Sequence, residues 1–158
     1  MKAPARMPRY ATAIPFGLAA RAVPRDERAE LIASARAGSV EAALAAAAML
    51  FAGVHGAADL PLALDLLRGP AERGVAEAAL MLGGVLWSIA GREAEGVTWL
   101  TGAAERGVAE AIYLLGLAYL RGQEVTCDLP LARALLVRAA EAGVADAQAE
   151  LDLVEAGR

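Results

Sequence analysis

The segment AERGVAEAALMLG, residues 71–83, recurs thirty-three residues later as AERGVAEAIYLLG, residues 104–116, with only three changes. A catalytic site needs one constellation of groups and gains nothing from being copied along the chain. A stack of similar modules, by contrast, must present the same interface to each neighbour. The duplicated segment therefore predicts a repeat architecture and gives no indication of a duplicated active site.

Four glycines extend this periodicity over most of the chain. Each follows a helix-forming run and precedes another, and their spacings are 36, 33 and 36 residues: Gly38, Gly74, Gly107 and Gly143. Glycine is favoured at the left-handed position that ends a helix. A unit of this length accommodates a pair of antiparallel helices. The predicted modules are residues 38–73, 74–106 and 107–142, followed by a C-terminal capping helix over residues 144–156.

A second repeated motif marks the start of the second helix in two of the modules. The sequence DLPLA occurs at residues 59–63 and again at residues 128–132. Aspartate accepts hydrogen bonds from the free amides of a helix start, and proline is tolerated in the first turn. The middle module lacks this motif and is three residues shorter, with SIAGREAE at residues 88–95 in its place. Its turn is predicted to be tighter and its second helix less well capped.

The two helices of each module differ in their pattern of charge. The second helices are amphipathic, with Asp65, Arg68 and Glu72 on one side in the first module. In the third module we expect Leu131 on the buried side and Val137 on the exposed side.

The first helices carry almost no charge beyond one acidic residue near each start, namely Glu41, Glu77, Glu110 and Asp146. A helix that is apolar nearly all round must be covered nearly all round, so these helices are predicted to form an inner layer. Small residues occupy the same position in each copy and would let helices approach closely: Ala42, Ala78, Ala111 and Ala147.

One further helix is expected at each end of the modules, at PRDERAELIASARAG before the first glycine and within residues 144–158. Their charged side chains suit the ends of a stack. The prediction is an all-α solenoid of eight helices. Residues 25–158 would form a single domain, preceded by a flexible N-terminal segment, residues 1–24.

One set of residues resembles a known repeat. The pattern of Ala111, Leu115, Gly116, Tyr119 and Gly122, followed by Asp128 and RAAEAG, is similar to the SEL-like repeat family, which is related to the tetratricopeptide repeats. The resemblance covers about residues 35–150 and implies an α-solenoid of about three repeats. It departs from the family pattern at Leu86 in the second module, where an aromatic residue is expected. The first module departs at Ala46, Ala47 and Leu50.

The resemblance also implies an inner, concave face that holds a peptide or a partner helix. The candidate binding residues on the first helices are Glu41, Leu44, Phe51, Glu77, Leu80, Trp87, Glu110, Tyr113, Leu117, Leu120 and Arg121. Aromatic anchors dominate many interfaces, and the acidic row favours a partner segment with Lys or Arg among apolar residues. Two alternatives to a binding role stay open. The acidic residues could serve only to stabilise helix starts, and the large apolar residues could serve only to fill the space between helices.

The function expected from these features is that of a non-enzymatic adaptor for another protein. The alternative is a structural subunit that associates with itself, as a homo-oligomer, through the same apolar face or through the ends of the solenoid. The net charge of −4 argues against nucleic acid as a partner.

The chain is 58% hydrophobic, which would suggest a membrane protein if the apolar residues came in long blocks. The longest uncharged run, residues 42–58, has 17 residues, at the lower edge of what spans a bilayer, so no membrane span is expected. A lone cysteine, Cys127, forms no internal disulfide, which favours the cytoplasm. The alternative is export, with residues 1–22 as a signal peptide, although Pro15 and Gly17 interrupt its apolar stretch.

Candidates for chemistry are few. His55 is the only histidine and lies in a loop, but the aligned third module has no histidine there. Cys127 precedes the capping Asp128, where a thiol can become acidic, yet no histidine is near it in sequence. The glycines do not form a phosphate loop, since no Gly-Lys-Ser/Thr ending is present. We therefore expect no catalytic residue, no metal site and no cofactor.

Overall fold

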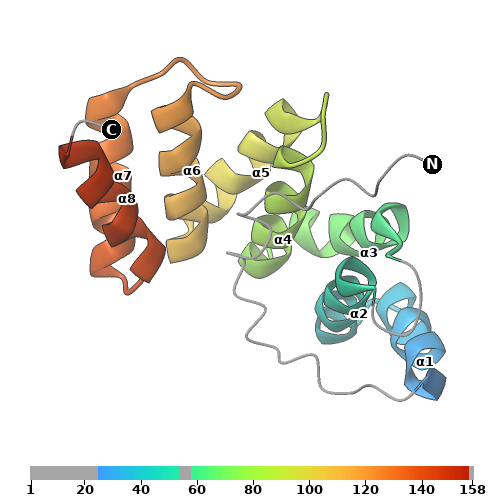
Figure 1. The fold of residues 1–158 in the computed structure, drawn as a ribbon. Helices are drawn as coiled ribbons and strands as arrows, with labels where there is room; N and C mark the ends of the chain where they lie inside the picture. The colour runs from blue at the N-terminus through green and yellow to red at the C-terminus, as the bar shows by residue number, and fades with distance from the viewer. Residues whose placement is uncertain (1–24, 54–57, 157–158) are drawn as a thin grey trace. The chain divides into compact units, whose positions relative to one another are not determined.

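The computed structural model describes residues 25–53 and 58–156, so His55 and the segment 1–24 lie outside the described residues. The described residues form eight helices and no strand: α1 (Arg25–Arg36), α2 (Val40–Ala52), α3 (Leu60–Glu72), α4 (Ala76–Trp87), α5 (Glu93–Glu105), α6 (Ala109–Arg121), α7 (Leu129–Glu141) and α8 (Ala145–Glu155) (Figure 1). The predicted all-α class is confirmed. None of the described helices has the length and apolar character that a transmembrane span requires.

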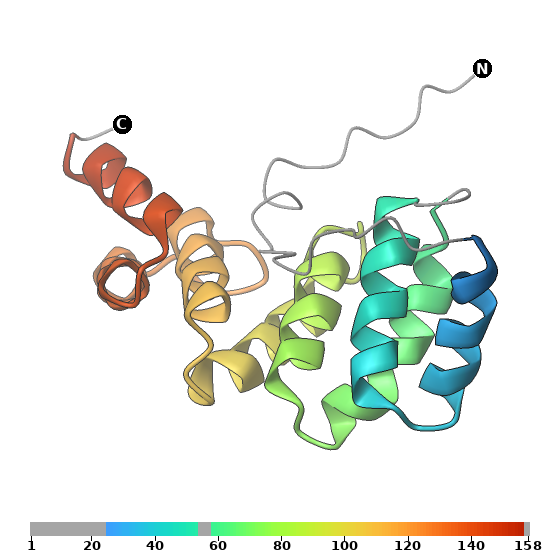
Figure 2. The same cartoon turned by 90° about the horizontal axis from the view of Figure 1, so that it is seen from below.

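The helices belong to two compact units that divide within α4, after Leu82. In the N-terminal unit, α2 packs against both α1 and α3. In the C-terminal unit, α6 packs between α5 and α7, and α8 packs against α7, as Figures 1 and 2 both show. Consecutive helices are therefore also neighbours in space within each unit, as expected for stacked helix pairs.

The helix boundaries follow from the glycine and aspartate positions in the sequence. The four glycines in register have φ angles between 84° and 104°, which only glycine adopts without strain. The Asp59 Oδ1 atom accepts a hydrogen bond from the Leu62 amide at 3.1 Å, and the Asp128 Oδ1 atom accepts one from the Leu131 amide at 2.9 Å. Both capping predictions are confirmed.

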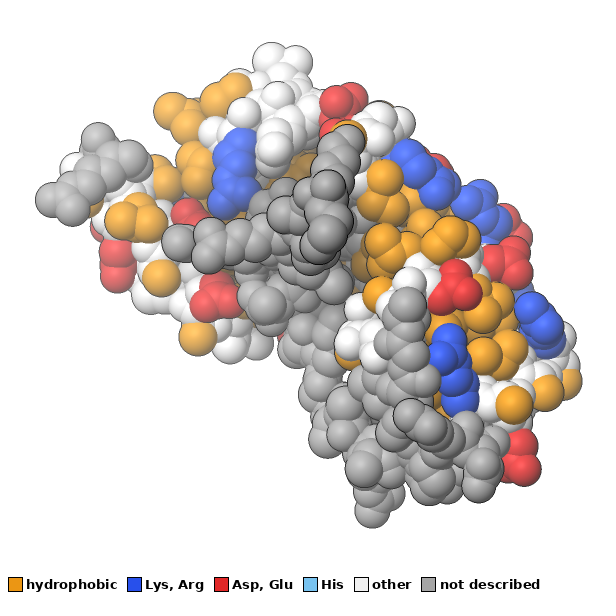
Figure 3. Space-filling model, turned by 45° about the vertical axis from the view of Figure 1, so that its right-hand side comes forward, with side chains coloured by type: hydrophobic (Ala, Val, Ile, Leu, Met, Phe, Trp, Pro, Cys, Tyr) orange, Lys and Arg blue, Asp and Glu red, His pale blue; other side chains and the backbone are white. Residues whose placement is uncertain are grey.

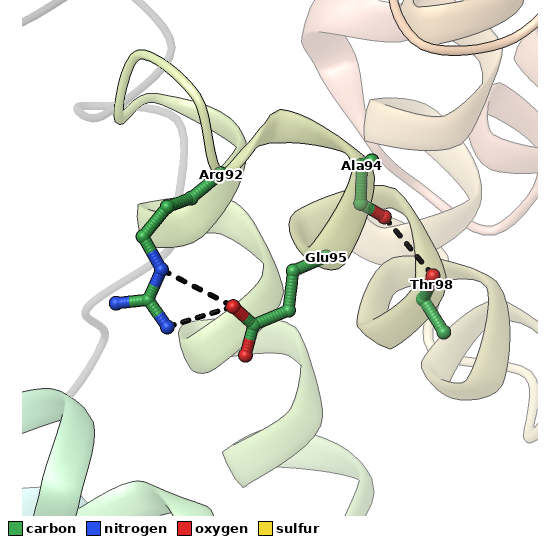
Figure 4. Close-up of polar contacts among 4 residues, drawn as sticks. All are labelled: Arg92, Ala94, Glu95 and Thr98. Carbon is green, nitrogen blue, oxygen red and sulfur yellow. Dashed lines mark hydrogen bonds and ion pairs between the residues drawn. The ribbon is translucent and has the colours of Figure 1, made fainter.

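The middle module has the shorter, uncapped turn that its sequence predicts. The α4 helix ends at Trp87 and α5 begins at Glu93, and the side chain of Arg92 makes no capping hydrogen bond. The Arg92 guanidinium instead donates to Glu95 Oε2, from Nε at 3.1 Å and from Nη2 at 2.7 Å (Figure 4). This partly exposed ion pair ties the turn to the first turn of α5, but it leaves the amides of the helix start without a side-chain cap.

The α4 and α5 helices approach each other so closely that their backbones touch. A Cβ atom added at Gly96 would lie 2.3 Å from the Trp87 nitrogen and 2.8 Å from the Gly83 carbonyl oxygen. In the third module, the three atoms nearest to a Cβ atom at Gly116 would belong to side chains, with Leu136 Cδ2 at 3.2 Å. Two glycines facing each other thus allow a closer contact in the middle module than in the third.

Burial follows the predicted difference between first and second helices. The repeated alanines of the first helices are at most 6% exposed: Ala42, Ala78, Ala111 and Ala147. On α3, Asp65, Arg68 and Glu72 are exposed, as expected.

The prediction for Leu131 is wrong, because its side chain is 38% exposed. Leu131 shares a side of α7 with the buried Leu135 but lies one turn nearer to the helix start. Side chains on a helix lean toward its N-terminus, so a first-turn leucine projects toward the end of the helix and away from its neighbours.

Candidate functional site

The structure divides the eleven candidate binding residues into a buried and an accessible group. Five side chains are at most 6% exposed: Phe51, Leu80, Trp87, Tyr113 and Leu117. The alternative role left open by the sequence, filling the space between helices, applies to these five. The other six are exposed or partly exposed: Glu41, Leu44, Glu77, Glu110, Leu120 and Arg121. Their role in binding stays a prediction.

Charged side chains of α6 and α8 lie near one another in the C-terminal unit. The Arg121 Nη2 atom, at the end of α6, is 3.9 Å from Glu150 Oε1 on α8. Burial raises the pKa of the Tyr113 phenol above its ordinary value of 10.0. The nearby carboxylates of Glu150 and Asp146 raise this pKa further, and Arg121 opposes them. The phenol of Tyr113 therefore lies within the electrostatic field of all three charged side chains.

An exposed leucine lies beside these charges. Leu153 is 47% exposed and follows Glu150 by three residues and Asp146 by seven, so the three share one side of α8. We call the set of Leu120, Arg121, Asp146, Glu150 and Leu153 the α6–α8 face. Figure 3 shows acidic and hydrophobic side chains side by side over the C-terminal helices, on the left of that view.

Three residues of this face are not among the eleven candidate binding residues. Asp146 was identified only as the acidic residue near the start of the last helix. Leu153 follows Leu117 by 36 residues, which is the spacing between Gly107 and Gly143, so extending the repeat register into the last helix would have found it. Glu150 occupies the position at which α6 has Leu114 and carries no repeat signal. Its proximity to Arg121 and Tyr113 in the structure identifies it.

Another side of α8 carries polar side chains that form hydrogen bonds. Gln148, Asp152 and Glu155 occupy the positions at which α6 has Ile112, Gly116 and Tyr119. The Gln148 Nε2 atom donates to Asp152 Oδ1 at 2.9 Å, and Arg133 Nη2 donates to Glu155 Oε1 at 2.6 Å. On the equivalent side of α6, Gly116 lies against α7. The polar side chains therefore occupy the side of α8 on which another helix would pack. This substitution disfavours stacking of a second copy on that side of α8.

The charges of the α6–α8 face give a testable titration. We expect Glu150→Gln to lower the pKa of Tyr113, because it removes a negative charge that disfavours the phenolate. Alkaline absorbance titration measures this pKa, with the Tyr113→Phe variant identifying the signal among the chain's three tyrosines. Asp65→Asn, on α3, is the control and should leave the Tyr113 titration unchanged. A pKa that is equally high in Glu150→Gln would contradict the proposed geometry.

The sign of the stability effect follows from the same shift. The folded state favours the neutral phenol of Tyr113. This preference contributes fully to the free energy of unfolding at pH values below 10.0, the ordinary pKa of a tyrosine. This contribution is lost as the pH rises through the higher folded pKa. Wild type should therefore lose more stability at alkaline pH than Tyr113→Phe does, as measured by urea unfolding.

Groups suited to chemistry are sparse in the described part of the chain. Cys127 is exposed, and its Sγ atom lies 3.7 Å from the Leu120 carbonyl oxygen. Within residues 25–53 and 58–156, no three His, Cys, Asp or Glu side chains meet as a metal site requires. The arrangement of the α6–α8 face suits noncovalent recognition, since it combines opposite charges with an exposed leucine.

Solved structures with a similar fold include two repeat proteins. A protective antigen from uropathogenic Escherichia coli strains, with an SLR fold, matches at 29% identity and a TM-score of 0.66, covering 73% of this chain. The chain spans only 26% of that antigen. A Sel1 repeat protein from Oxalobacter formigenes matches at 29% identity and a TM-score of 0.64, covering 82% of this chain and 98% of its own. No protein-family model and no curated protein matches the sequence significantly.

Both similar structures are built from the repeat that the sequence pattern around Gly116 resembles. Proteins with this repeat generally mediate protein–protein interactions, and the fold is typically a non-catalytic scaffold. The repeated glycines, the aspartate caps and the eight helices agree with that architecture. The chain has the SEL-like repeat fold of these two structures.

Proposed function

We propose that the protein is a non-catalytic adaptor whose α6–α8 face binds an extended or helical segment of another protein. The observation that carries this proposal is Leu153, a large apolar side chain that is 47% exposed and shares one side of α8 with the carboxylates of Glu150 and Asp146. An exposed leucine on the same side of a helix as two charged residues offers both an apolar contact and a means of orienting the partner.

The charge on α8 indicates the chemistry of that segment. The helix carries four acidic residues, Asp146, Glu150, Asp152 and Glu155, and no lysine or arginine. Opposite charges accelerate association and disfavour partners with the wrong charge. We therefore propose a partner segment that places Lys or Arg next to an apolar residue, so that the cation meets Asp146 or Glu150 while the apolar side chain covers Leu153.

Site-specific photocrosslinking tests the proposal. A photoreactive amino acid replaces Leu153 in one version of the full chain and Val137, which is 38% exposed on α7, in the control version. Both versions are expressed in the native cell and irradiated, and the products are identified by mass spectrometry. We expect a discrete heterologous protein joined through position 153 and absent from the version labelled at position 137.

The sequence of the crosslinked segment provides a second criterion. It should carry Lys or Arg beside apolar residues, and the crosslink should weaken in an Asp146→Asn, Glu150→Gln background. Crosslinks at position 153 that join only two copies of this chain would favour the self-associating subunit. Equal labelling from both positions would overturn a specific role for the α6–α8 face.

A further inference from the structure

We propose that residues 1–24 of this chain are themselves a ligand of the α6–α8 face and compete there with the partner protein. This segment contains Lys2, Arg6, Arg9 and Arg21 and no acidic residue. All 19 acidic residues of the chain, but only 11 of its 15 basic residues, lie in residues 25–158. The chain thus carries a basic segment joined to an acidic domain.

The acidic side chains on α8 provide the complementary surface. The pair between Arg121 and Glu150 is long, at 3.9 Å, and the Glu150 side chain is 26% exposed. Long ion pairs between partly exposed side chains contribute little to stability, so an arginine of the segment can compete with Arg121 for Glu150. Asp146 lies one turn before Glu150 on the same side and extends the negative surface along the helix.

The segment also matches the apolar part of the face. Apolar residues alternate with its cations, with Tyr10 directly after Arg9 and with Ile14 and Phe16 following. Leu153, three residues after Glu150, is 47% exposed, and Leu120, next to Arg121, is partly exposed, so both offer apolar surface. One segment can therefore satisfy charge and burial together, which is the chemistry that the proposed function assigns to an external partner.

Covalent attachment makes such a contact effective even if it is weak. A segment of 24 residues extends at most ~80 Å, and tethering replaces a bimolecular encounter by an effective concentration in the millimolar range. The regulatory consequence rests on the proposed function, because a partner that uses the α6–α8 face must displace the segment. The contact itself does not require an external partner.

The lone cysteine allows a direct test on the full chain. A nitroxide attached to Cys127, which is exposed and close to the Leu120 carbonyl group, broadens the NMR signals of amides that come near this end of α6. We expect the amide signals of residues 6–18 to lose intensity in the wild type relative to the same sample with the nitroxide reduced. The loss should decrease with added salt, because salt screens exposed charges.

Two variants separate charge recognition from random proximity. Asp146→Asn, Glu150→Gln should restore the intensity of the segment's signals. Asp65→Asn, Glu72→Gln removes two exposed carboxylates from α3 and should leave the loss unchanged. The proposal is overturned if the wild-type signals keep full intensity, or if the α8 variant broadens them as strongly as the wild type does.

A mixed sample distinguishes contact within one chain from contact between copies. Isotope-labelled Cys127→Ser protein is combined with spin-labelled protein that carries no isotope, and its N-terminal signals should keep full intensity. Broadening in this mixture would overturn the assignment to the same chain. If photocrosslinking at position 153 captures a partner while residues 6–18 show no broadening, the proposed function stands and this inference fails. If the broadening is present but no partner is captured, only the proposed function fails.

Discussion

Gly96→Ala should destabilise the C-terminal unit by more than the ~1–3 kcal/mol usual for overpacked cores. The added Cβ would lie 2.3 Å from the Trp87 nitrogen and 2.6 Å from its Cα. Both atoms belong to the backbone, so no rotamer change relieves the clash, and the two helices must move apart. Alanine's higher helix propensity returns at most about 1 kcal/mol.

Gly102→Ala provides a matched control in the same helix. A Cβ atom there meets only Arg106 Nη1, at 3.4 Å, at the end of a flexible side chain. We expect this variant to be neutral or up to about 1 kcal/mol more stable, because alanine favours the helix. Urea unfolding followed by circular dichroism measures both free energies. Similar values for the two variants would show that the α4–α5 contact tolerates a side chain.

Leu136→Ala should cost ~2–5 kcal/mol, the range for removing a fully buried leucine from a core. The Leu136 side chain has 0% exposure, and its Cγ and Cδ2 atoms would each lie 3.2 Å from a Cβ atom placed at Gly116. Truncation therefore leaves a cavity where α6 and α7 meet, and the neighbouring backbone at Gly116 has no side chain to fill it.

The next residue serves as the control for this variant. Val137 is 38% exposed, and Val137→Ala should change the free energy of unfolding by about 0.5 kcal/mol or less. Thermal unfolding with calorimetry compares the two. If Leu136→Ala were as mild as Val137→Ala, the assignment of Leu136 to the core between α6 and α7 would be wrong.

Local sequence signals predicted much of the fold. Gly38, Gly74, Gly107 and Gly143 give the helix ends because a left-handed turn needs glycine, whatever surrounds it. The caps at Asp59 and Asp128 were predictable because donor and acceptor are three residues apart. The weak cap at Arg92 was predictable from the missing aspartate.

Features that depend on distant residues were not predictable in the same way. Nothing in EAEGV, residues 93–97, indicates that Gly96 touches the backbone at Trp87. The burial of Tyr113 and Leu117 depends on packing around α6, and the helical pattern alone placed both on the accessible side. Glu150 joins the candidate site through Arg121 and Tyr113, which lie 29 and 37 residues earlier in the sequence.

The backbone contact between Gly83 and Gly96 has a mechanical consequence. Packed helices usually slide past each other through small changes in the rotamers of the side chains between them. Neither glycine has a side chain that could change its rotamer at this contact. Leu100 packs against the Gly83 side of the contact. The last turns of α4 and the α5 helix should therefore move as one rigid body. Bending within the C-terminal unit should occur where helices contact each other through longer side chains, as α6 and α7 do.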